Sequence, residues 1–295
     1  MPSISDVLLD VPDADSHAPI PGSIAIIGGG NMARSLIGGL VALGMPASRI
    51  VVSEPHTDLR DALVHDFGVC THADNNDATT AADVWVLAVK PQVLRAVCEA
   101  LSAQAQERRP LVVSIAAGIT TQQIESWLGG GIAIVRCMPN TPALLGAAAT
   151  GMFANAHTSI PQRERAQRLM DAVGISVWID DEAQMNTITA TSGSAPAYVF
   201  LLLEAMQAAA EAQGLPADTA RALLTQSVLG AARMLTESGE SAQVLRQRVT
   251  SPGGTTQAAI AVFEAGGFGA LVGAAIAAAN ARGAQLAAET EKGSE

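Results

Sequence analysis

The sequence predicts an α/β domain with a parallel sheet, followed by an all-helical domain. From Ser23 to about Asp180, short β-branched runs alternate with stretches of helical character, which is typical of parallel βαβ units. After Asp181 no strand-like alternation is found, and breaks rich in glycine, serine and proline separate long alanine-rich stretches. The 295 residues are enough for two domains, each with its own core.

Six short apolar runs in the first half are predicted to be strands. They are Ile24–Ile27, Ile50–Ser53, Val84–Val89, Leu111–Ile115, Ala133–Arg136 and Val177–Ile179. Helical stretches lie between them, and parallel crossovers are right-handed, so we expect one twisted sheet with helices on both faces. This domain is expected over residues 22–180.

The second half, residues 181–288, is predicted to be a helical dimerisation and substrate domain. Its expected helices are Glu182–Ala190, Pro196–Gln213, Ala217–Glu237, Ala242–Val249, Thr255–Ala265 and Phe268–Ala288. The stretch 271–281 is apolar on every face, and such a helix has to be buried. We expect it to pack partly against a second subunit in a homo-oligomer, the alternative being a helix through the centre of its own domain.

The two ends and the composition limit the protein class. Residues 1–21 are expected to be a disordered leader rather than a signal peptide, and residues 289–295 a polar tail. The net charge of −11 and the lack of a basic run give no footprint for nucleic acid or for an anionic membrane. The three scattered cysteines predict reduced thiols rather than disulfides or a metal site, and no apolar stretch is long enough to span a bilayer. We expect a cytoplasmic protein.

The first predicted strand runs directly into a glycine-rich turn. The residues Gly28-Gly-Gly-Asn-Met-Ala33 form a Gly-x-Gly-x-x-Ala pattern, and a helix-compatible stretch follows. Between a strand and a helix, this pattern predicts a dinucleotide site. Gly28 allows the tight turn, Gly30 lets the backbone approach a pyrophosphate, and the first-turn N–H groups face the phosphates. The first domain is therefore expected to be of the Rossmann type.

The residues after the second strand bear on the choice of cofactor. Glu54 lies about where an acidic residue binds the 2′-hydroxyl of the adenine ribose, which favours NADH because a carboxylate repels a 2′-phosphate. Ser53, His56 or Arg60 could still serve such a phosphate. The sequence leaves the choice between NADH and NADPH open.

The residue types missing from the second half limit the chemistry. All five histidines precede it, and the only lysines are Lys90 and Lys292. Dehydrogenases that act on hydroxy acids usually need a histidine or lysine as proton relay. We therefore expect hydride transfer to a carbon–nitrogen double bond, because a protonated imine already carries its proton and its charge. Reduction of a small keto acid is the alternative that this absence argues against.

A second glycine-rich segment, Thr250-Ser-Pro-Gly-Gly-Thr-Thr256, opens a predicted helix. Consecutive N–H groups and hydroxyls at a helix start can bind a carboxylate. An ordinary capped helix start is the alternative, although the segment has more donors than capping requires. Ser192-Gly-Ser194, shortly before Pro196, is a second polar turn of similar kind.

Six segments of the chain occur in the same order in a known family. They are Ile24–Ala33, Ala88–Pro91, Ser114–Gly118, Arg136–Pro142, Ser192–Tyr198 and Thr250–Thr256. Together they closely resemble pyrroline-5-carboxylate reductase, over about residues 23–288. The resemblance implies a Rossmann domain followed by a helical dimerisation domain with interlocked subunits, a homodimer that can assemble to a decamer. It implies reduction of 1-pyrroline-5-carboxylate to L-proline with NADPH or NADH.

The resemblance also implies roles for single residues. Thr256 matches the threonine whose hydroxyl hydrogen-bonds the ring nitrogen, and Val249 lines the ring. The substrate carboxylate is implied at Ser251, Gly253, Gly254 and Thr255. The implied cofactor residues are Gly28, Gly30, Asn31, Met32, Ser53, Glu54, Ala88, Lys90, Pro91, Ala116, Ala117 and Asn140.

Two positions depart from the family pattern. Ala195 stands where the family has the second glycine of Ser-Gly-Ser-Gly-Pro, and Asn186 stands where an aspartate is expected. A positive φ at position 195 would cost alanine about 1 kcal/mol of strain. These departures leave open a catalytically weakened NAD(P)-binding regulatory relative. A reductase of another cyclic imine on the same scaffold is a separate alternative.

Overall fold

The computed structural model describes residues 22–292, so the expected leader of residues 1–21 lies outside the described residues. The described chain forms two compact units. One unit holds residues 22–196 together with residues 277–292, and the other is Ala197–Ile276.

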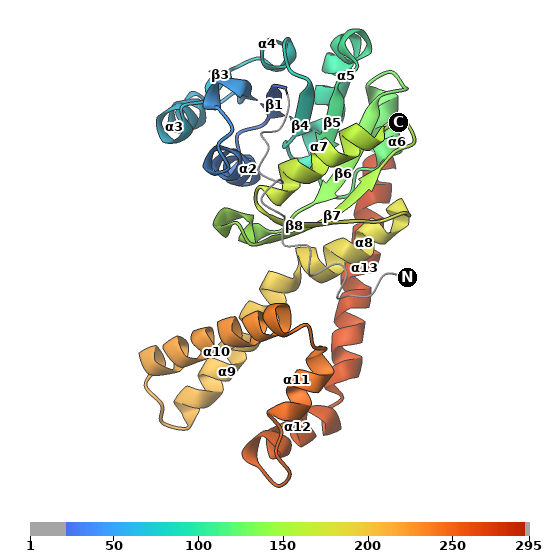
Figure 1. Cartoon of the computed structure of the whole chain (residues 1–295). Coiled ribbons are helices and arrows are strands. Elements are labelled where there is room, and N and C mark those ends of the chain that lie inside the picture. Colours follow the sequence, from blue (N-terminus) through green and yellow to red (C-terminus); the bar gives the residue numbers. More distant parts are fainter. Residues whose placement is uncertain (1–21, 293–295) are drawn as a thin grey trace. The chain divides into compact units, whose positions relative to one another are not determined.

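The first unit contains an eight-stranded sheet in the order β3-β2-β1-β4-β5-β6-β7-β8 (Figure 1). Its strands are β1 (Ile24–Ile27), β2 (Ile50–Ser53), β3 (Cys70–His72), β4 (Val84–Leu87), β5 (Leu111–Ser114), β6 (Ala133–Met138), β7 (Ala148–Ala154) and β8 (Gly174–Trp178). β6 and β7 pair antiparallel, and all other neighbours pair parallel. The predicted α/β class with a mainly parallel, Rossmann-type sheet is confirmed.

Helices cover both faces of this sheet, as predicted. They are α2 (Asn31–Ala42), α3 (Thr57–Phe67), α4 (Asn75–Thr79), α5 (Pro91–Arg108), α6 (Thr121–Trp127) and α7 (Ile160–Asp171). Successive strand residues point to opposite faces. Ile24 and Ile26 therefore join a core with α2, α3 and α7, whereas Ala25 and Ile27 join a second core with α5 and α6.

Two strands were missed at the sequence level, and a third was placed too late. β3 has only three residues, and β7 reads Ala-Ala-Thr-Gly-Met-Phe-Ala, without a β-branched run. β8 begins at Gly174 rather than at Val177. Pairing with β6 and β8 holds β7 in the sheet, and β7 and β8 run opposite to the other strands.

Short helical turns follow β8 where a single helix was expected. They are η4 (Glu182–Gln184), α8 (Met185–Ile188) and the π-helical turn η5 (Thr189–Gly193). The N–H of Ser194 donates to the carbonyl of Thr189 at 3.0 Å, which closes the wide turn. Ala195 begins the next helix, and Arg109 is the one described non-glycine residue with a positive φ. The strain considered for Ala195 therefore does not arise.

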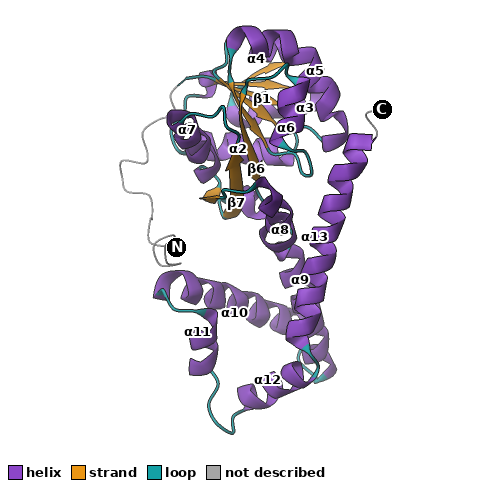
Figure 2. Cartoon of the chain, turned by 90° about the vertical axis from the view of Figure 1, so that its right-hand side faces the viewer, coloured by secondary structure: helices purple, strands orange, loops and turns teal. Residues whose placement is uncertain are grey.

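The second unit is helical, and Figure 2 draws its described residues as helices and loops. Its elements belong to α9 (Ala195–Ala212), α10 (Ala217–Ser238), α11 (Ala242–Arg248), α12 (Thr255–Ala265) and α13 (Phe268–Lys292). Leu201 and Leu271 are 66% and 68% exposed within the chain. The apolar stretch of α13 thus does not run through the centre of its own unit.

The hydropathy of the described helices bears on whether one of them could cross a bilayer. No single helix has the required length and hydropathy, although the pair Thr255–Ala265 and Phe268–Gln285, bent by 54° at its break, meets both criteria when taken together.

Candidate active site

The carboxyl ends of the parallel strands gather most of the predicted cofactor residues along one edge of the sheet. Ile27, at the end of β1, is in register with Ser53 of β2 and with Leu87 of β4. Leu87 is in turn in register with Ser114 of β5. The loops that follow these strands therefore start side by side, and this edge is where ligands bind in open α/β sheets.

The glycine turn after β1 has the geometry of a nucleotide-binding loop. Gly28 has φ +100°, and its N–H donates to the carbonyl of Ser53 at 2.8 Å. A Cβ added at Gly28 would lie 2.8 Å from the carbonyl oxygen of Ala88, too close for any other residue. A Cβ at Gly30 would meet nothing within 4 Å, so the backbone there is open to a ligand. These residues fit a dinucleotide.

The start of α2 is free to receive an anion. Gly30 is its N-cap, and among the described residues there is no side-chain cap hydrogen bond at this helix start. Asn31 is exposed and Met32 is half-buried in this turn. Uncapped N–H groups at the positive end of a helix dipole attract phosphate.

Glu54 is buried at the end of β2 and lies against the glycine turn. Its Oε2 accepts the N–H of Gly29 at 2.9 Å, and its Oε1 accepts the N–H and the ring Nδ1 of His56 at 3.0 and 2.7 Å. Burial alone would raise the pKa of this carboxyl, but the hydrogen bonds from His56 and Gly29 outweigh it and lower the pKa. Glu54 is therefore ionised at neutral pH.

Two predicted cofactor residues use their side chains within the fold. The buried Ser53 hydroxyl is 2.7 Å from Asn75 Oδ1. The Asn140 amide donates to the carbonyl of Ser192 at 2.9 Å and accepts the N–H of Ala149 at 3.0 Å. Asn140 thus ties the loop after β6 to the π-helical turn and to β7. Contact of either side chain with a cofactor stays a prediction.

The remaining predicted cofactor residues lie on the loops after β4 and β5. Ala88 follows β4 directly, and its N–H donates to the carbonyl of Ile27 at 2.9 Å. Lys90 is exposed as the N-cap of α5, and Pro91 occupies the first turn of that helix. After β5, Ala116 is buried, whereas Ala117 is exposed.

The predicted substrate residues all lie in the second unit, where they form the loop before α12 and its first turn. Gly254 is the N-cap of α12, and no side chain caps this helix. Val249 is 58% exposed, and Ser251, Thr255 and Thr256 are exposed too. Among the described residues, the structure records no intramolecular partner for the hydroxyl of any of these three. The Gly254 N–H donates to the carbonyl of Ser251 at 3.0 Å, whereas the three hydroxyls and the N–H groups of Thr255 and Thr256 are available to a ligand.

The sequence analysis did not single out Gln257, whose side chain contacts this loop. Gly253 has φ +72°, and its N–H donates to Oε1 of Gln257 at 2.6 Å. Gln257 lies in the first turn of α12 and places a neutral oxygen where the sequence predicted a substrate carboxylate. A ligand that uses the Gly253 N–H has to displace this side chain. The only sequence signal for this contact was the four-residue spacing between Gly253 and Gln257 at the start of a helix.

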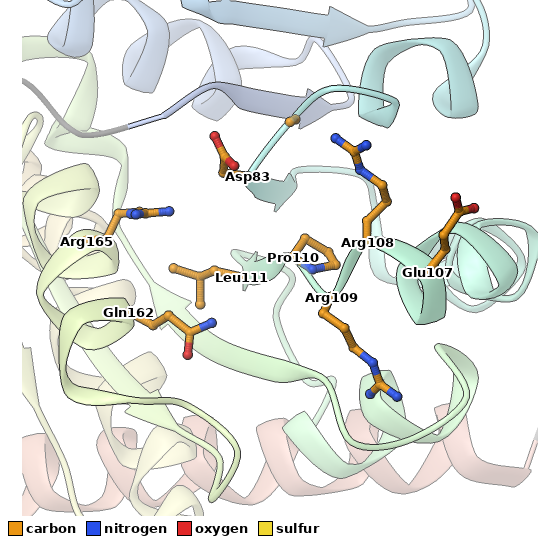
Figure 3. Close-up of a pocket in the computed structure, with 9 residues that line it drawn as sticks. Asp83, Glu107, Arg108, Arg109, Pro110, Leu111, Gln162 and Arg165 are labelled. Carbon is orange, nitrogen blue, oxygen red and sulfur yellow. The ribbon is translucent and has the colours of Figure 1, made fainter.

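A polar pocket of about 400 Å³ lies elsewhere in the first unit (Figure 3). Its lining includes Asp83 and Leu111, at the amino ends of β4 and β5, and three arginines. Figure 3 shows that Arg108 and Arg109 point in opposite directions, so the arginines do not converge on one point. Because this pocket lies at the edge opposite to the carboxyl ends, it is not the nucleotide site.

Comparisons with known proteins bear on both parts of the chain. A family model for NADP oxidoreductase, coenzyme F420-dependent, matches residues 23–118, and one for pyrroline-5-carboxylate reductase dimerisation matches residues 182–286. The pyrroline-5-carboxylate reductase of Pseudomonas aeruginosa is 52% identical over 264 residues, which cover 90% of this chain and 96% of the relative. The chain belongs to the pyrroline-5-carboxylate reductase family.

Further relatives agree with this family assignment. The Haemophilus influenzae pyrroline-5-carboxylate reductase is 46% identical and covers 89% of this chain and 97% of its own. A solved pyrroline-5-carboxylate reductase structure from Coxiella burnetii is 48% identical, with a TM-score of 0.87 over 90% of this chain and 98% of that one. As a member of the pyrroline-5-carboxylate reductase family, the chain is an NAD(P)H-dependent oxidoreductase, and the dimerisation match indicates a homodimer.

Proposed function

We propose that the chain reduces the C=N bond of 1-pyrroline-5-carboxylate and releases L-proline. The observation that supports this most directly is the start of α12, where the N–H groups of Thr255 and Thr256 and the exposed hydroxyls of Ser251, Thr255 and Thr256 have no partner among the described residues. A small carboxylate is the ligand that such a helix start prefers. Family membership supplies the reaction class, and the lack of histidine or lysine in the second unit's sequence fits an imine.

We propose the following division of roles. The carboxylate of the substrate binds at Gly253, Gly254 and Thr255, where it replaces Gln257 on the Gly253 N–H and Ser251 adds a hydroxyl donor, and Val249 contacts the ring. The Thr256 hydroxyl faces the ring nitrogen and stabilises it as its charge changes. Gly28, Gly30, Asn31 and Met32 hold the pyrophosphate.

The other proposed cofactor contacts lie along the same sheet edge. Ser53 and Glu54 are assigned to the adenine ribose, and Ala88, Lys90, Pro91, Ala116, Ala117 and Asn140 to the rest of the nucleotide. Bound NAD(P)H supplies the hydride. The chain itself contributes proximity and orientation, which can be worth several kcal/mol.

One assay tests the proposal. Purified enzyme is mixed with 1-pyrroline-5-carboxylate and with NADH or NADPH in parallel, and proline is measured. We expect proline with at least one nucleotide. Nucleotide binding without proline formation would favour a catalytically weakened regulatory protein. Turnover of a different cyclic imine in a substrate panel would favour a reductase of that imine.

Thr256→Val tests the role of the hydroxyl. Removing one preorganised donor should lower kcat by roughly 100-fold or more. Thr256→Ser keeps the hydroxyl and should retain most of the activity. This variant separates the effect of losing the hydroxyl from the effect of a change in packing. The melting temperatures of both variants should match the wild type because Thr256 is exposed. A near-normal kcat/KM for Thr256→Val would remove this residue from the reaction.

We infer that the apolar face of α9 and α13 forms the subunit contact. A groove of about 420 Å³ on this face is lined by Tyr198, Val199, Leu201, Leu202, Ala205, Phe268, Leu271, Val272, Ala275 and Ile276. Exposed apolar surface of this kind is typical of obligate interfaces.

We propose that such dimers assemble to a decamer in the cytoplasm. Light scattering of the purified protein would give the mass, and a dimer alone would contradict the decamer.

A further inference from the structure

The end of β2 places one carboxylate and two basic side chains where the adenine ribose is proposed to bind. The question they bear on is which nicotinamide nucleotide the chain prefers, so the inference rests on the proposed function. NADH and NADPH differ at the 2′ position of this ribose. NADH carries a hydroxyl there, which can donate a hydrogen bond, whereas NADPH carries a negatively charged phosphate.

The carboxylate of Glu54 is held in place by the chain itself. Its oxygens take three donors, two from His56 and one from the N–H of Gly29. A Cβ at Gly29 would lie 3.2 Å from the Cβ of Glu54, so this side chain packs directly on the nucleotide-binding turn. An ionised carboxylate offers about four acceptor positions. One position is therefore left for a hydroxyl, and the charge stays fixed beside the ribose.

The neighbouring arginine is already engaged. Nη1 of Arg60 donates to the carbonyls of Glu54 and Pro55 at 2.7 and 2.8 Å, and Nη2 donates to the hydroxyl of Thr57 at 3.0 Å. The guanidinium thus closes the loop after β2 on itself. A 2′-phosphate would have to compete with these three acceptors to recruit it.

His56 is the remaining basic group at this position. Its side chain is 75% exposed, and its Nδ1 is directed at Glu54. It therefore supports the carboxylate, and only its other ring nitrogen could reach a phosphate. The loop as a whole offers an acceptor for a hydroxyl and no preformed set of donors for a phosphate.

We propose that Glu54 is the specificity-determining residue of the nucleotide site and makes this chain prefer NADH over NADPH. It accepts a ribose hydroxyl and repels a 2′-phosphate, while its bond to Gly29 fixes the turn.

Binding measured without the imine substrate tests this preference independently of catalysis. Purified enzyme is titrated with NADH and with NADPH at one ionic strength, and nucleotide fluorescence gives both Kd values. We expect NADH to bind at least about tenfold more tightly in the wild type, as a like charge at close range implies. Glu54→Gln keeps the size of the side chain and should tighten NADPH binding about tenfold, with a smaller change for NADH. Glu54→Ser should shift the ratio in the same direction.

Asp58→Asn is the matched control. Asp58 is an exposed carboxylate in the first turn of α3, so this variant removes an equal charge that does not contact the glycine turn. It should change both Kd values alike. Tighter binding of NADPH by the wild type would overturn the proposal. So would a Glu54→Gln variant that weakens both nucleotides equally, because Glu54 would then only brace the turn.

The His56→Ala variant and the proline assay separate the remaining outcomes. A selective loss of NADPH binding in His56→Ala would show that His56 holds a phosphate, and would also overturn the proposal. If the wild type binds NADH more tightly but forms no proline with either nucleotide, the proposed function fails and the preference stands.

Discussion

Replacing Glu182 should destabilise the first unit strongly, because its carboxylate supports a buried cation. Glu182 Oε1 accepts Nη1 of Arg136 at 3.0 Å and the N–H of Thr121 at 2.8 Å, and Oε2 accepts the Thr121 hydroxyl at 2.7 Å. The side chains of Arg136 and Glu182 are 5% and 19% exposed. Glu182→Ala leaves a buried guanidinium without its counter-charge, which costs about 3–5 kcal/mol. In a chain of this size the melting temperature should fall by about 10 °C.

The measurement is denaturant unfolding at one protein concentration, because subunit association also contributes to stability. Glu99→Ala is the control: its partner Arg95 is 2.7 Å away, but both side chains are about half exposed, so the cost should stay below about 1 kcal/mol. Adding Arg136→Met to Glu182→Ala should recover part of the loss, since the unpaired charge is then gone. A loss below about 1 kcal/mol for Glu182→Ala, or no recovery in the double variant, would refute this account.

Two further predictions concern titratable groups. Burial raises the pKa of Asp171, against the hydrogen bond from Ser176. A raised carboxyl pKa favours folding at low pH and disfavours it once the folded group ionises, so Asp171→Asn should be more stable than the wild type near pH 7. Unfolding curves at several pH values should show this gain vanish below about pH 4, and a gain that persists there would contradict it. For the thiols, burial and then the nearby Glu99 raise the pKa of Cys98 to about 12, and burial raises that of Cys137, whereas Cys70 is exposed. A thiol reagent should label Cys70 alone in the native protein and all three cysteines after denaturation, so rapid labelling of Cys98 would be the contrary result.

The strand–turn–helix around Gly28 could be predicted from the sequence because its residue types are forced. The position has a positive φ, and a Cβ there would collide with the carbonyl of Ala88. Only glycine satisfies both conditions, so a glycine at this position predicts the turn. The strands β1 and β4 were also predictable, because short continuous apolar runs are typical of parallel strands that are buried on both faces.

β7 could not be predicted, because nothing in its own residues distinguishes it from a loop. Its sequence is mostly small residues, and it becomes a strand through pairing with β6 on one side and β8 on the other. β-propensity depends on such neighbours far more than helix propensity does. The helix expected at Glu182–Ala190 is likewise divided into η4, α8 and η5, and the carbonyl of Ser192 in η5 accepts a hydrogen bond from Asn140, 52 residues earlier.

The site residues also differ in how much of their role the sequence alone could predict. The sequence located Glu54 from its distance to the glycine turn, but its partners Gly29 and His56 became visible only in the fold, since the first contact spans 25 residues. These partners change what the residue can do. A free carboxylate could turn away from a 2′-phosphate, whereas one held by three donors keeps its charge in place. The proposed preference for NADH therefore rests on the anchoring of a single side chain, which the sequence alone could not reveal.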